Sequence, residues 1–127
     1  LASLKPLMHR TTPGPRDPER WMAREREARP AAAALDRHFA DLSAKLGGRD
    51  FLCGSLSAAD IAVFTAVLFA LRLGGATLDD HPALAGWYRR LLERPAFAGV
   101  AGEIVAVDRQ LSAMVEGAYG DGKWLPW

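Results

Sequence analysis

The amino-acid sequence predicts an all-α fold, a bundle of about five helices. Apolar residues recur at intervals of three and four along most of the 127-residue chain, which is typical of the buried face of a helix. We find no alternation of apolar and polar residues that would indicate strands, and no hairpin signal. Prolines, glycines and capping residues fall between the periodic stretches, where helices are expected to start and stop.

The composition fits a single globular domain over residues 1–127. Half of the residues are hydrophobic, and charges of both signs are mixed to a net charge of +1, so no basic field would attract nucleic acid. The longest apolar run, residues 61–71, is about half the roughly 20 residues that a membrane span requires. One cysteine excludes an internal disulfide and suits a reducing compartment, so we expect a cytoplasmic protein.

The N-terminal residues 1–17 are expected to hold the end of a first helix and a loop. Prolines and a glycine break regular structure in the stretch TTPGPRDP. Asp17 is placed to cap the next helix, with Pro18 in its first position. Because proline has no backbone donor to offer, we expect a kink or a restart of that helix at Pro30.

This second helix is expected to end at Gly47 and Gly48, which permit a left-handed C-terminal turn. Its apolar or small residues are spaced alternately by four and three positions, which places them on one face. They are Ala28, Ala32, Leu35, Phe39, Leu42 and Leu46.

The next helix, residues 57–73, is apolar on nearly every side, so we expect other helices to surround it. Ser57 and Asp60 fit a capping box at its start, and the flanking Leu56 and Ile61 stand at the positions of a hydrophobic staple. The carboxylate would then satisfy backbone donors rather than act as a catalytic acid. Replacing Asp60 by Ala should cost about 1–3 kcal/mol of stability.

Two further helices and a tail complete the predicted domain. The stretch DDHP opens one helix with a carboxylate and an early proline, and RPAF leads into the last helix. The inward face of the first should carry Leu84, Trp87, Tyr88, Leu91 and Leu92. The last helix repeats the spacing at Phe97, Val100, Ile104, Val107, Leu111 and Met114. Residues 117–127 form a glycine-punctuated tail.

No residue pattern indicates a catalytic or metal site. The histidines at positions 9, 38 and 81 lack the spacing of a helical zinc site, and no phosphate-binding loop or nucleophile elbow is present. Cys53 has the apolar neighbours Phe51, Leu52 and Leu56, so we expect it to be a packing residue. The sequence therefore predicts no catalytic residue and no metal ligand.

Three stretches, taken together and in order, resemble the C-terminal helical domain of glutathione S-transferases. FLCGSLSAADIAVFTAVL resembles the central buried helix of that family, ALDRHFADLSAKLGGRDFL the helix before it, and HPALAGWYRRLLERPAF the segment after it. The resemblance covers roughly residues 18–115. We see no counterpart of the thioredoxin-like N-terminal domain that binds glutathione and carries the catalytic Tyr, Ser or Cys in this family.

The resemblance implies how such a domain would work in a full-length enzyme. Glutathione would be the co-substrate, bound by the thioredoxin-like domain, and this chain alone is expected to bind none and to be inactive. The helical domain would supply the wall of a pocket for a hydrophobic small molecule and part of a homodimer interface.

The matching positions give candidate binding residues. Leu4, Leu7 and Met8 match the first helix of the family domain and would line the pocket or the dimer interface, or else belong to the core. Arg10 would pair with a carboxylate of glutathione or of a dimer mate, or else would be a solvated arginine. In the tail, Tyr119 and Trp124, with Trp127, would form a lid or anchor the tail to the bundle.

Three functions stay open at this stage. The first is the C-terminal half of an enzyme that conjugates glutathione to apolar electrophiles. The second is a non-catalytic interaction module of the same fold that mediates protein assembly, and the third is a free-standing bundle that binds an apolar ligand. The residues encoded before Leu1 would distinguish the first two, because a thioredoxin-like pattern there would favour the enzyme.

Overall fold

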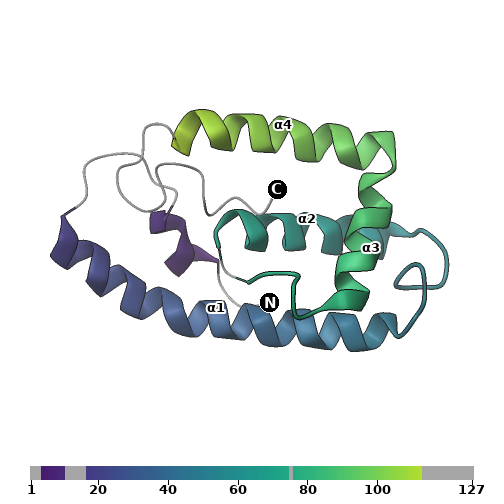
Figure 1. Ribbon diagram of the computed structural model, residues 1–127, viewed down its shortest axis with the longest axis horizontal. Helices are drawn as coiled ribbons and strands as arrows, with labels where there is room; N and C mark the ends of the chain where they lie inside the picture. The colour runs from purple at the N-terminus through teal and green to yellow at the C-terminus, as the bar shows by residue number, and fades with distance from the viewer. Residues whose placement is uncertain (1–3, 11–16, 75, 113–127) are drawn as a thin grey trace.

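The computed structural model describes residues 4–10, 17–74 and 76–112, and it confirms the all-α prediction (Figure 1). The described residues form a short 3-10 helix and four α-helices, without a strand. The elements are η1 (Lys5–Arg10), α1 (Pro18–Leu46), α2 (Ala58–Arg72), α3 (Pro82–Leu92) and α4 (Pro95–Ser112). Among these residues, no helix is both long and apolar enough to span a membrane.

Helix α1 begins and ends where the capping residues predict. The Asp17 side chain accepts a hydrogen bond from the Arg20 N–H at 3.0 Å, and Gly47 closes the helix with a left-handed φ of +47°. Pro30 lies inside α1 without ending it, so the predicted restart is wrong. Because Pro30 is exposed, water can take the place of the missing backbone donor on that side of the helix.

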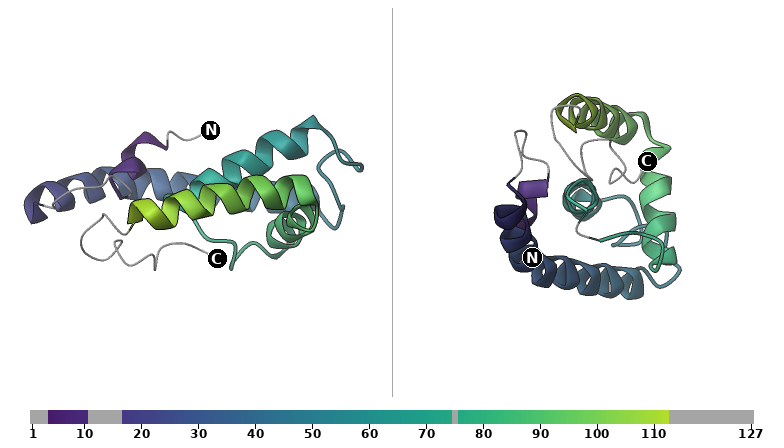
Figure 2. Two further views of the ribbon diagram at one scale, coloured as in Figure 1. Left: turned by 90° about the horizontal axis from the view of Figure 1, so that it is seen from above. Right: turned by 60° about the vertical axis from the view of Figure 1, so that its left-hand side comes forward.

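Helix α2 lies at the centre of the fold. In the right-hand view of Figure 2, which looks nearly along α2, the other helices are arranged around it. Asp60 and the apolar residues of one face are buried: Phe64, Val67, Leu68, Ala70 and Leu71. The opposite face is open, because Ile61 is 55% and Phe69 38% exposed, so the prediction that helices enclose α2 on nearly every side is only partly right.

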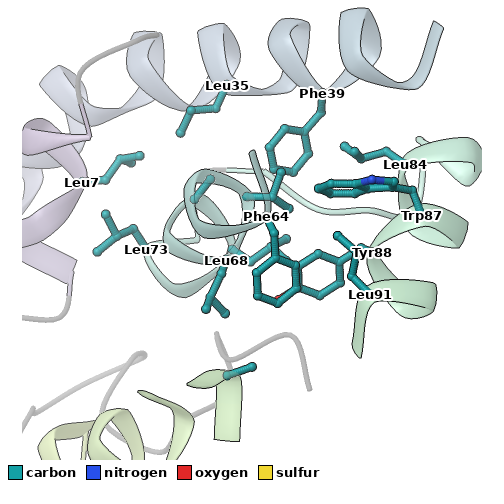
Figure 3. Close-up of a cluster of buried hydrophobic side chains, with 14 of the residues drawn as sticks. Leu7, Leu35, Phe39, Phe64, Leu68, Leu73, Leu84, Trp87, Tyr88 and Leu91 are labelled. Atoms are coloured by element: carbon teal, nitrogen blue, oxygen red, sulfur yellow. The ribbon is translucent and has the colours of Figure 1, made fainter. Parts of the chain in front are cut away.

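An aromatic cluster joins α2 to α3 and α4. The Phe64 ring stacks on Tyr88 of α3, as Figure 3 shows, with 4.9 Å between the ring centroids. It also meets Phe97 of α4 edge-on, again with 4.9 Å between centroids. Trp87 is wholly buried beside them. The predicted inward face of α3 is confirmed, with Leu92 only partly buried.

Three smaller expectations differ from the structure. On α4, Val100 and Val107 are exposed, because the face that packs on the bundle carries Phe97, Ala101 and Ile104 instead. Cys53 is exposed rather than packed, since its loop turns sharply at Gly54 with a φ of +87°. Leu56 and Ile61 are 36% and 55% exposed, so a staple between them would bury little apolar surface.

Candidate functional site

The N-terminal end of α2 is organised by one buried carboxylate. Ser57 and Asp60 form the predicted capping box, in which the Asp60 carboxylate accepts the Ser57 N–H at 2.9 Å. The Ser57 hydroxyl also donates to this carboxylate, over 2.9 Å. Two further donors reach it from outside the box, the Leu52 N–H at 3.0 Å and the Trp87 indole N–H at 2.9 Å. The carboxylate thus joins the loop before α2, the first turn of α2 and the middle of α3.

These hydrogen bonds keep Asp60 ionised although it is fully buried. Burial raises the pKa of the carboxyl, but the bonds from Leu52, Trp87 and Ser57 outweigh this and bring its pKa below the ordinary value. A carboxylate held by four donors and closed to solvent has no position at which to take a proton from a substrate. Asp60 is therefore a structural residue, as the capping pattern predicts, and the bonds from Trp87 and Leu52 are the part that sequence spacing did not indicate.

A second carboxylate, that of the partly buried Glu25, lies near the other end of α2. The Glu25 side chain on α1 accepts two hydrogen bonds from the Arg10 guanidinium, at 2.8 and 3.1 Å. His9 Nε2 lies 2.9 Å from the same carboxylate, and the His9 ring packs on Trp21 with 4.5 Å between centroids. The bonds from Arg10 lower the pKa of the Glu25 carboxyl below its usual value, although burial acts the other way.

Arg10 also binds the C-terminal end of α2. Its Nη1 donates to the Leu73 carbonyl oxygen at 3.3 Å and to the Gly74 carbonyl oxygen. Helix ends leave such carbonyls without intrahelical donors, and a cation there is favourable to the helix dipole. Gly74 has a φ of +60°, and a Cβ at this position would lie only 3.2 Å from Arg10 Nη1. The guanidinium thus connects η1, α1 and the end of α2.

The structure separates the predicted binding residues of η1 from one another. Leu7 is wholly buried and points into the core, where Figure 3 shows it near Leu35 and Leu73. Leu4 is half-buried and Met8 is 57% exposed. Arg10 is 7% exposed and paired with Glu25, so the interpretation of a solvated arginine is wrong. Tyr119, Trp124 and Trp127 lie outside the described residues.

Other polar groups in the described part of the chain suggest no catalytic or metal centre. His81 Nε2 lies 2.8 Å from Asp36 Oδ1 and so ties the start of α3 to α1. The Tyr88 hydroxyl is buried without a hydrogen-bond partner, and burial raises its pKa well above the ordinary value. The described residues contain no group of side chains able to hold a metal ion.

An apolar surface runs along α2 between its two anchored ends. Ile61, Thr65 and Phe69 are exposed and spaced by four positions, so they share one side of the helix; we refer to them as the open face. The Thr65 hydroxyl bonds back to the Ile61 carbonyl oxygen at 3.0 Å, which uses its donor within the helix. The Arg72 guanidinium lies over the Phe69 ring, 4.8 Å from its centroid, and borders the face at one end.

Comparison with known proteins gives one match. The family model described as "Glutathione S-transferase, C-terminal domain" matches residues 6–95, from η1 to the start of α4. No curated protein and no solved structure matches the chain significantly.

Proposed function

Since the chain belongs to the glutathione S-transferase C-terminal domain family, we propose that it is the helical half of a glutathione S-transferase-like protein. In that protein a thioredoxin-like domain would bind glutathione and carry the reactive centre. The helical half would supply the wall of a pocket for a hydrophobic electrophile and part of a homodimer surface. The reaction would be the attack of the glutathione thiolate on an electrophilic carbon, with loss of the leaving group.

The open face of α2 is the observation that carries this proposal. Ile61 and Phe69 are 55% and 38% exposed on the helix that otherwise forms the centre of the core. Large apolar side chains left exposed together on one side of a central helix favour a covering partner. We assign that place to the thioredoxin-like domain, since the family pairs the two domains.

The pocket wall would include Met8 of η1 and Leu4, the residue just before η1, both of which keep exposed surface. Leu7 and Arg10 would support the wall without contacting the substrate. Leu7 lies in the core, and the Arg10 guanidinium is bound to Glu25. Tyr119 and Trp124 stay candidates for a lid. A reducing, cytoplasmic compartment suits the exposed thiol of Cys53.

The second candidate is a non-catalytic interaction module of the same fold. It is favoured by the open face of α2, while the carboxylates of Asp60 and Glu25, which both accept hydrogen bonds from donors within the domain, are consistent with either function. Neither has a free position for acid–base work on a ligand. In this case the open face of α2 would bind another protein rather than help to form a substrate site.

Conjugation of glutathione to a chloronitrobenzene tests the proposal. We expect the purified chain to be inactive and not to be retained on immobilised glutathione. The same chain joined to the residues encoded before Leu1 should conjugate the substrate, if those residues have a thioredoxin-like pattern with a Tyr, Ser or Cys nucleophile site. Turnover by the chain alone would contradict the assignment of the reactive centre to the thioredoxin-like domain. An inactive joined protein would favour the interaction module.

Light scattering tests the role of the open face. The isolated chain should self-associate as its concentration rises, because the open face is uncovered. Ile61→Gln should reduce this association. Val100→Gln is the matched control, since Val100 on α4 is exposed to the same 55%. A chain that stays monomeric at high concentration, or that responds equally to both substitutions, would contradict the assignment.

A further inference from the structure

We infer that Glu25 is a positioning residue, which fixes η1 on the bundle and thereby sets where Met8 stands at the surface. The inference rests on the proposed function, in which η1 forms part of the wall of the substrate pocket. It concerns a residue of α1 that points to η1 rather than to the pocket, so it acts through Arg10 and His9.

The 3-10 helix η1 needs fixing from outside. It has six residues, longer than most 3-10 helices, and this geometry is less stable than an α-helix. Its apolar anchor is Leu7, which is wholly buried. Leu7 holds the segment at one point of the core, and the other two buried side chains of η1, His9 and Arg10, are polar and depend on partners outside η1. A second attachment is needed to decide which way Met8 faces.

Glu25 supplies this second attachment through two consecutive residues of η1. One carboxylate oxygen lies 2.8 Å from Arg10 Nε and 2.9 Å from His9 Nε2, and the other accepts from Arg10 Nη2 at 3.1 Å. The His9 ring is oriented in turn by its Nδ1, 3.1 Å from the Pro6 carbonyl oxygen within η1. The side chains of Glu25, Arg10 and His9 are at most 13% exposed, so water screens the Glu25–Arg10 ion pair weakly.

The same arrangement orients the Arg10 guanidinium toward the C-terminal end of α2. With two of its nitrogens held by Glu25, the guanidinium presents Nη1 to the Leu73 and Gly74 carbonyl oxygens. A planar guanidinium can make both sets of bonds at once, whereas a lysine ammonium is a point charge with no such fork. Without Glu25, the buried charge of Arg10 would lack its counter-charge, and a turn of the side chain toward water would carry η1 with it.

Hydrogen exchange of backbone amides, measured on the full chain, tests the inference directly. In Glu25→Gln we expect the exchange of the η1 amides to accelerate about tenfold more than that of the α3 amides, whose acceleration reports the loss of overall stability alone. The matched control is Glu27→Gln, an exposed glutamate two positions along α1, which should change neither. A residue important only for overall stability would accelerate both helices together, and unchanged η1 amides would also overturn the inference.

A second variant covers the case in which Glu25→Gln does not fold. Arg10→Lys keeps the charge beside Glu25 but loses the fork that reaches both the carboxylate and the α2 carbonyls. We expect the same selective loss of protection in η1. Wild-type exchange in folded Arg10→Lys would overturn the inference, because it would mean that η1 is held without these bonds.

The consequence for function is measured separately. In the joined protein, Glu25→Gln should raise the KM for the apolar electrophile several-fold and leave the KM for glutathione and kcat unchanged. An unchanged KM for the electrophile, with η1 loosened, would overturn the role in the substrate site. If the wild-type joined protein does not conjugate glutathione at all, the proposed function fails, while the exchange experiment still decides whether Glu25 positions η1.

Discussion

The two ends of α2 are both held by carboxylates, one buried and one partly buried, but the two arrangements differ in chemistry. At the N-terminal end, Asp60 accepts hydrogen bonds from uncharged donors only, from Ser57, Leu52 and Trp87. At the C-terminal end, Glu25 faces the cation Arg10, which in turn binds the last carbonyls of the helix. Each end has the charge that the helix dipole favours, a carboxylate at the start and a guanidinium at the finish.

The difference between the two ends also lies in the distance along the chain. The donors to Asp60 come from three to 27 residues away, and those of Ser57 belong to a local motif. Arg10 reaches the end of α2 from 63 and 64 residues away. The first end is therefore fixed as the helix itself forms, whereas the second is completed only when η1, α1 and α2 pack together.

The largest effect is expected from Asp60→Ala. It leaves four donors without an acceptor, among them the indole of the wholly buried Trp87, so we expect a loss of about 3–4 kcal/mol in the free energy of unfolding. This exceeds the 1–3 kcal/mol estimated from the capping box alone, because the Trp87 and Leu52 bonds are added. Urea unfolding measures it, with Asp41→Ala, an exposed carboxylate on α1, as the control. A midpoint equal to that of the wild type would contradict the structural role of Asp60.

Glu25→Gln should have the next largest effect. The amide cannot balance the charge of Arg10, and we expect a loss of about 2–3 kcal/mol. If the two ends are independent, the losses in Glu25→Gln and Asp60→Asn should add in the double variant within about 0.5 kcal/mol. A marked departure from additivity would show that anchoring one end of α2 depends on the other.

The pH dependence of stability should report both ends. The pKa of each carboxyl is lower in the folded chain than in the unfolded one, so the unfolded chain binds protons more readily as the pH falls. The stability that the two groups confer is present above their unfolded pKa values, about 4. It is lost as the pH falls through the lower, folded values. Urea unfolding between about pH 6 and pH 2 should give a shallower pH dependence in Asp60→Asn and in Glu25→Gln than in the wild type.

The smallest effect concerns a buried polar group that has no partner. The Tyr88 hydroxyl is buried, and its ring stacks on Phe64 in the core. Removing it in Tyr88→Phe keeps the ring contacts and relieves an unsatisfied hydroxyl, so we expect a gain of about 1 kcal/mol in thermal or urea unfolding. A destabilised variant would instead indicate a bond from the hydroxyl to a bound water or ligand.

Spacing rules predicted the parts of this fold that depend on neighbours in sequence. The caps at Asp17 and Gly47, the Ser57–Asp60 box and the buried face of α3 are all confirmed. The same rules failed where exposure depends on what packs from elsewhere, as at Val100 on α4, at Cys53 and on the open face of α2. Periodicity identifies apolar residues but does not say which of them another helix will reach.

What the sequence determined by itself is therefore the set of helices, their ends and the ionised state of a capped Asp60, because these depend on backbone donors within a few residues. Only the tertiary structure decided that Trp87 completes the Asp60 site and that Arg10 is buried against Glu25 rather than solvated. Both outcomes require segments that are far apart in the sequence to pack together. A charged side chain is buried only where that packing supplies a partner of opposite charge or a hydrogen-bond donor.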